Sequence, residues 1–230
     1  MLKKITLLSC LLAIFFIAQG AHSEEKPYDE AISLGNSCQV TWQLKANGFR
    51  TFAYPFDWFH TPSTGLLGFI TYQGSNFFDI DKISVIGPYP GDPICLQVMD
   101  LNFGIMSYHD FTSNPPFANY WDVKLKYDRR IKRFFNLLNS NKKVLLVRLG
   151  DSRQEIECLD YLLQQNYPKL NYTILAVHET EDFKLDWGLD RIKNYYIKQI
   201  PWNWQGDVAS WKAVLENFHI KTNNDALLND

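Results

Sequence analysis

The C-terminal half of the chain alternates short apolar runs with segments of helical periodicity, and this alternation constrains the fold more than any other feature. Residues 143–148, 172–177 and 195–200 are predicted strands. Residues 152–165 and 207–218 are predicted helices. Strands that alternate with helices form βαβ units around a largely parallel sheet. The sequence therefore predicts an α/β fold with a mostly parallel sheet flanked by helices.

The N-terminal half begins with a similar unit. A short strand is expected at residues 31–34 and a tight turn at 35–37, where Ser37 can cap a helix over 38–46. Further helices are expected at 64–72 and 121–138. Residues 96–99 and 104–108 are predicted to form a short hairpin, and residues 87–93, rich in Gly and Pro, are predicted to be loop.

The first residues have the pattern of an export signal. Lys3 and Lys4 precede an apolar run over residues 5–18, and Ala21 and Ser23 fit a cleavage site. The run is too short to span a bilayer comfortably, since a span takes about 20 apolar residues. We therefore expect a cleaved signal peptide at 1–23, a single mature domain at 24–230, a secreted or periplasmic location, and no stable membrane insertion after cleavage.

Charge and cysteine spacing narrow the classes of partner. Cleavage removes two of the 23 basic residues and none of the 25 acidic ones, so the net charge moves from −2 to −4. No basic stripe is present, which argues against nucleic acid. The sequence contains no zinc-ligand spacing, and we predict neither a metal nor a cofactor. Cys38, Cys95 and Cys158 remain after cleavage, so at least one thiol stays unpaired. The sequence does not decide whether Cys95 and Cys158 form a disulfide.

Cys38 is the first candidate for chemistry because it lies where a predicted strand turns into a helix. Amide groups at a helix N-terminus favour a thiolate, which is the nucleophilic form of cysteine. The same amides, with those of the turn at 35–37, could hold an oxyanion. The structural alternative is a small buried cysteine that packs the helix.

His109 and Asp57 complete the candidate set. His109 ends a predicted strand and could accept the Cys38 proton. Asp57 lies in the aromatic loop YPFDW (residues 54–58) and either orients His109 or accepts backbone hydrogen bonds. Asp110 is a poorer orienter, because adjacent side chains of a strand point to opposite faces.

These motifs resemble a bacterial family of unknown function, the putative papain-like cysteine peptidases. The resemblance rests on SLGNSC at residues 33–38, YPFDW at 54–58 and HDF at 109–111, and covers residues 31–177. It implies Cys38 as nucleophile and His109 as base, and it implies a papain-like α+β fold as the alternative to the α/β prediction.

The leading hypothesis is an exported cysteine-dependent hydrolase or acyltransferase that acts on a peptide or amide bond of an unidentified substrate. Cys38 attacks, His109 is the base and Asp57 orients it. One alternative is a non-catalytic module that binds an anionic or sugar ligand between the 55–58 loop and a rim at Arg148 and His178. The other is an SGNH-like esterase or glycan hydrolase, although such enzymes use serine where this chain has Cys38.

Overall fold

The computed structural model describes residues 26–180 and 185–221 of the 230-residue chain. The predicted signal peptide lies outside the described residues. The helices are α1 (Cys38–Ala46), α2 (Ser63–Thr71), η1 (Ile80–Lys82), α3 (Tyr120–Leu138), α4 (Arg153–Asn166) and α5 (Val208–Leu215). The strands are β1 (Glu30–Ser33), β2 (Phe59–His60), β3 (Ile83–Tyr89), β4 (Asp92–Asp100), β5 (Met106–Thr112), β6 (Lys143–Leu149), β7 (Asn171–Glu179) and β8 (Ile192–Ile197).

Four strands form a parallel sheet in the order β1-β6-β7-β8. Ile32 pairs with Leu146, and Leu146 pairs with Ile174 on the next strand. The carboxyl ends of β1, β6 and β7 therefore meet at one edge of the sheet, where ligands bind in many α/β proteins. The α/β prediction is confirmed by this sheet.

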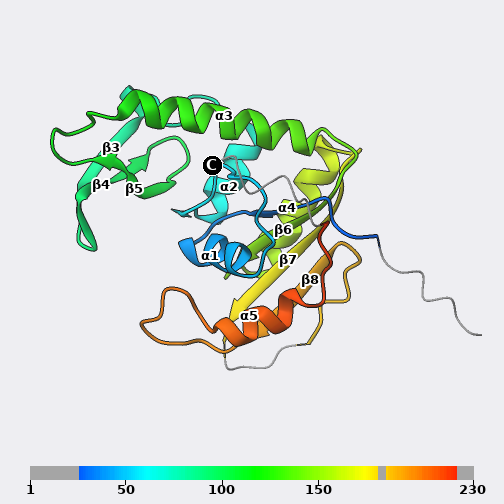
Figure 1. Cartoon of the computed structure of the whole chain (residues 1–230). Helices are drawn as coiled ribbons and strands as arrows, with labels where there is room; N and C mark the ends of the chain where they lie inside the picture. Colours follow the sequence, from blue (N-terminus) through cyan, green and yellow to red (C-terminus); the bar gives the residue numbers. More distant parts are fainter. Residues whose placement is uncertain (1–25, 181–184, 222–230) are drawn as a thin grey trace, which may run out of the picture.

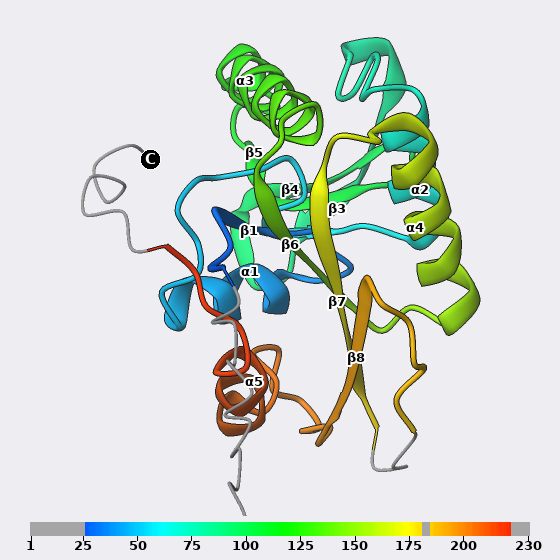
Figure 2. The same cartoon turned by 90° about the vertical axis from the view of Figure 1, so that its right-hand side faces the viewer.

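Helices cover both faces of the parallel sheet, which explains the long apolar runs of its two central strands, β6 and β7. Leu145 and Val147 of β6 belong to a core shared with α1 and α5, whereas Val144 and Leu146 belong to a core shared with α2, α3 and α4. Figure 2 shows α4 and α2 on one side of the strands and α1 and α5 on the other. In Figure 1 the long helix α3 runs along the top of the molecule.

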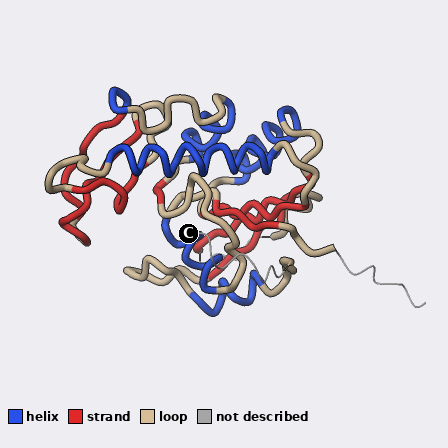
Figure 3. Tube along the Cα trace, turned by 45° about the horizontal axis from the view of Figure 1, so that its top comes forward, coloured by secondary structure: helices blue, strands red, loops and turns tan. Residues whose placement is uncertain are grey.

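A second sheet is antiparallel, with the order β2-β5-β4-β3. It lies beyond one end of α3, apart from the parallel strands (Figure 3). The prediction of a loop at residues 87–93 is wrong for most of that segment, because β3 and β4 continue through it and leave a turn at Pro90 and Gly91. Gly87 and Pro88 are tolerated because β3 is an edge strand with irregular register.

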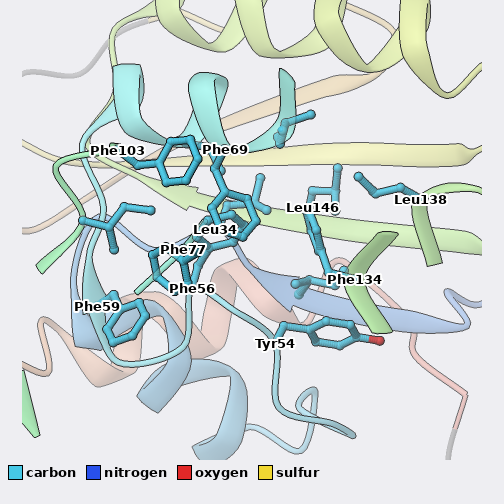
Figure 4. Packing of buried hydrophobic residues seen from close by; sticks show 14 of the residues in the cluster. Leu34, Tyr54, Phe56, Phe59, Phe69, Phe77, Phe103, Phe134, Leu138 and Leu146 are labelled. Atoms are coloured by element: carbon cyan, nitrogen blue, oxygen red, sulfur yellow. The ribbon is translucent and has the colours of Figure 1, made fainter. Parts of the chain in front are cut away.

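An aromatic cluster joins the two sheets. Phe59 of β2 stacks on Tyr127 of α3 at 5.0 Å, and Phe56 meets Phe69 of α2 and Phe134 of α3 edge to face. Figure 4 shows Phe56, Phe69 and Phe134 packed near Leu34, which follows β1, and Leu146 of β6. Such ring pairs add about 0.5–1.5 kcal/mol beyond area burial. The cluster fixes the position of β2 and β5 relative to β1.

Three further findings concern the described residues only. None of their helices has the length and apolar character of a membrane span. Their His, Cys, Asp and Glu side chains form no group that could hold a metal ion. Cys38, Cys95 and Cys158 are unpaired thiols, so Cys95 and Cys158 are not joined by a disulfide.

Candidate active site

Cys38 is the first residue of α1, directly after the turn that follows β1. Ser37 caps the helix by accepting a hydrogen bond from the Gln39 amide. Gly35 has a left-handed backbone (φ +76°), and a Cβ there would lie 2.6 Å from Thr61 Oγ1. The turn therefore requires glycine, and it places the Cys38 sulfur at the carboxyl edge of the parallel sheet.

Two non-glycine residues near Cys38, one two positions before it and one whose carbonyl contacts its sulfur, have left-handed backbones. Asn36 has φ 77° and Trp58 has φ 68°. The Trp58 carbonyl accepts a hydrogen bond from Cys38 Sγ at 3.2 Å, and the Asn36 side chain donates to Leu149 O at 2.6 Å. Such conformations cost of order 1–3 kcal/mol each and concentrate at functional sites. Their position beside one thiol supports a functional role for this corner.

Cys38 lies between two cavities that we call the arms of one cleft. The first arm, about 730 Å³, is lined by residues that include His60, Gln39, Glu179 and Trp202. The second arm, about 690 Å³, is lined by residues that include Trp58, Asp92 and His109. Cys38, Tyr89 and Trp204 line both arms. Cys38 therefore borders cavities on two sides, as expected of a nucleophile that attacks the middle of an extended ligand.

His60 of β2 lines the first arm with its ring held in one orientation. Its Nδ1 lies 2.8 Å from the Asn36 carbonyl oxygen. A carbonyl oxygen only accepts hydrogen bonds, so Nδ1 donates, and the neutral ring keeps Nε2 as an acceptor. No role for His60 was predicted from the sequence, although it follows the YPFDW motif by two residues.

His109 of β5 lines the second arm with Cys38 and is exposed. Its ring meets the Tyr89 ring edge to face at 4.8 Å. In residues 26–180 and 185–221, no hydrogen bond joins Cys38 Sγ to a ring nitrogen of either histidine. Catalytic hydrogen bonds are often formed only when substrate is bound.

Asp57 does not lie beside His109, and the prediction that it orients this ring is wrong for the observed structure. Asp57 is 2% exposed and lines neither arm of the cleft. Its carboxylate pairs with Arg50 Nε at 3.0 Å and accepts from the Tyr54 amide at 3.1 Å. Burial raises the pKa of the Asp57 carboxyl, and the Arg50 guanidinium opposes that shift. The observed contact with the Tyr54 amide agrees with the alternative prediction, in which Asp57 accepts backbone hydrogen bonds.

Asp110 also points away from the cleft, as the alternation of strand side chains predicts. Its carboxylate accepts from Ser107 Oγ at 2.7 Å and from the Tyr127 hydroxyl at 3.0 Å, and it pairs with Lys126. In the described part of the chain, neither candidate carboxylate orients His109.

The resting state of Cys38 differs from the expected thiolate. Burial raises the pKa of the Cys38 thiol to about 11, its own backbone amide lowers the pKa, and the negative charge of Asp110 raises it further. Desolvation of the half-buried sulfur thus outweighs the helix N-terminus. The thiol is protonated at neutral pH, so nucleophilic attack requires a base.

The predicted ligand rim at Arg148 is wrong for a physical reason. Arg148 is fully buried, and its guanidinium is paired with Asp151 at 2.8 Å and bonded to the Leu34 carbonyl at 2.8 Å. It links the end of β6 to the end of β1 and has no surface for a ligand. His178 lines a neighbouring cavity of about 510 Å³ at the same edge, which shares Glu179 with the first arm.

An α/β chain with a cysteine at a helix N-terminus, in a cleft lined by two imidazoles, has the groups of a thiol-dependent enzyme. Comparison with family models agrees, because residues 29–182 match the family described as "Putative papain-like cysteine peptidase". The chain belongs to this family.

A viral relative was also found. An uncharacterized protein of Acanthamoeba polyphaga mimivirus is 27% identical over 217 residues, covering 81% of this chain and 96% of the viral protein. No solved structure matches the chain.

Sequence reasoning missed part of the cleft wall. Tyr89 and Tyr108 come from strands of the antiparallel sheet, and Glu179 ends β7. Because residues 87–93 were predicted to be loop, the hairpin of β3 and β4 that carries Tyr89 was not predicted. Glu179 could have been found from its position, since it ends the strand next to β6 at the carboxyl edge of the sheet.

Proposed function

We propose that this protein is a cysteine-dependent hydrolase of peptide or amide bonds, with Cys38 as nucleophile and His109 as general base. The observation that carries the proposal is that Cys38 and His109 line the same arm of the cleft. His60 is the second candidate base, favoured by the Nδ1 hydrogen bond that leaves its Nε2 as an acceptor.

The reaction follows from the protonated state of the thiol. As Cys38 Sγ attacks the carbonyl carbon, its proton passes to the imidazole and an S–C bond forms. The amides of Ser37 and Cys38 head the helix, where N–H groups lack intrahelical partners, and they stabilise the oxyanion. The imidazolium then protonates the leaving amine as the C–N bond breaks. Water hydrolyses the thioester, or an amine accepts the acyl group in a transferase.

A first expectation is that cleavage depends on Cys38 and one histidine. Purified mature protein is assayed against a library of internally quenched peptides, beside Cys38→Ala, His109→Ala and His60→Ala. Cys38→Ala abolishes cleavage, and loss of the base lowers kcat about 10²- to 10⁴-fold. Cys158→Ala is the matched control, because Cys158 is exposed and lines neither arm.

Two results would decide against this assignment. Undiminished cleavage by Cys38→Ala would refute the nucleophile. A large loss in His60→Ala with none in His109→Ala would transfer the role of base to His60.

We also propose, from the sequence, that residues 1–23 are removed on export and that the mature chain acts in the periplasm or outside the cell.

A further inference from the structure

The side chains in the two arms that carry a charge at neutral pH are acidic. Glu179 contributes to the first arm and Asp92 to the second, and neither lining contains a lysine or arginine. The field in the cleft therefore disfavours an anionic ligand and favours a cationic one.

Glu179 is held in position by residues behind it. Gln39, 4% exposed, donates from Nε2 to Glu179 Oε1 at 2.7 Å. A Cβ on Gly206 would lie 2.1 Å from Gln39 Nε2 and 2.7 Å from Glu179 Oε1, so the backbone at Gly206 packs directly on this pair. In the described part of the chain the other oxygen, Oε2, receives no hydrogen bond, which leaves an acceptor on a residue that lines the first arm. Glu179 also lines the neighbouring cavity with His178 and Arg153.

Aromatic side chains surround this carboxylate. Trp202 is fully exposed and Trp204 is 56% exposed, and both line the first arm together with Tyr89 and Tyr108. Trp204 is supported by an edge contact from Trp42 at 6.2 Å. Large exposed aromatic side chains beside a cleft mark a binding surface. Their faces attract an ammonium or guanidinium group and also cover its aliphatic stem.

We propose that the first arm is a specificity site for a lysine or arginine side chain of a peptide substrate, with Glu179 as the residue that selects its charge. This inference rests on the proposed function, because it treats the two arms as the sides of the scissile bond. A neutral sugar would use the aromatic faces but would leave the oriented Glu179 oxygen without a counter-charge.

The experiment measures binding without chemistry. The probes are alanine-glycine hexapeptides, blocked at both ends, that carry a single lysine moved through each position, with glutamine and glutamate series as matched sets. Binding to the Cys38→Ala protein is followed by calorimetry. In the best position the lysine peptide binds at least about tenfold more tightly than the glutamate peptide, and Glu179→Gln removes this preference.

The control is Glu157→Gln, an exposed acid of α4 that lines neither arm, which leaves the preference unchanged. Circular dichroism confirms that each variant is folded. Equal affinity for all three series, a preference that survives Glu179→Gln, or tight binding of neutral oligosaccharides with weak binding of every peptide would overturn the inference. Lysine-selective binding with no cleavage by the wild type would instead refute the proposed hydrolase while the cationic site stands.

Discussion

At the scale of single residues, the protonated Cys38 thiol governs how the site works. A resting thiolate is absent because desolvation raises the pKa of the sulfur to about 11. Reactivity then depends on a base that acts during attack, and the same protonation protects the thiol from unrelated electrophiles, since the thiolate is the reactive form.

Iodoacetamide tests this state of Cys38. At pH 7.5 we expect Cys38 to be alkylated more slowly than the exposed Cys158, because little of it is ionised, and its rate should rise steeply as the pH approaches 11. Peptide mapping by mass spectrometry measures both rates in one sample. A Cys38 rate that levels off below pH 8 would contradict the raised pKa.

Asp57 has a structural role that a variant can separate from catalysis. Asp57→Ala removes a buried carboxylate that pairs with Arg50 Nε and accepts a hydrogen bond from the Tyr54 amide. Removing one member of a buried ion pair costs about 3–5 kcal/mol, so the free energy of unfolding should fall by that amount in urea titrations. Under conditions where the variant is folded, its cleavage rate should lie near that of the wild type. An unchanged free energy of unfolding together with a much lower cleavage rate would show that Asp57 takes part in catalysis.

At the scale of elements, α1 carries the nucleophile and its N-cap sets the direction of the Cys38 amide. Helix α4 offers a comparison, because it is also capped by a serine: Ser152 accepts from the Glu155 amide, and the Glu155 carboxylate accepts from the Ser152 amide. Ser37 adjoins Cys38, whereas Ser152 lines neither arm of the cleft.

Ser37→Ala and Ser152→Ala should therefore behave alike in stability and differently in rate. Each loses about 1 kcal/mol of unfolding free energy, the usual cost of a lost N-cap. Only Ser37→Ala should also lower kcat, because it loosens the amides that hold the oxyanion. Equal kcat for the two variants would mean that the α1 terminus does not take part in the reaction.

The elements also show what sequence can predict. The helix at 38–46 was predicted with its observed bounds because Ser37 and Asn47-Gly48 mark its ends locally. Strands β6 and β7 were predicted because burial on both faces makes them continuously apolar. Strand β3 was not predicted because it contains Gly87 and Pro88, which usually indicate a loop. It is an edge strand, where the backbone N–H that proline lacks is not needed for pairing. The partners of Asp57 could not be predicted, since Thr41 and Arg50 reach it only through the fold.

At the scale of the whole molecule, the cleft lies where two sheets meet. The parallel sheet supplies Cys38 through β1 and α1, and the antiparallel sheet supplies His60 on β2 and His109 on β5. The ring cluster around Phe59 holds the sheets together. Because the base and the nucleophile come from different sheets, neither the periodicity of the sequence nor the spacing between these residues could predict the distance between them.

The most direct test of this account is acylation of Cys38 by a set of peptidyl p-nitrophenyl esters. Release of nitrophenolate is followed by stopped flow, and the quenched protein is mapped by mass spectrometry. We predict a burst of one nitrophenolate per protein and an acyl group on Cys38, with a burst about 100-fold or more slower in His109→Ala. A burst that persists in Cys38→Ala, or that is equally fast in His109→Ala and His60→Ala as in the wild type, would contradict an imidazole-assisted cysteine nucleophile.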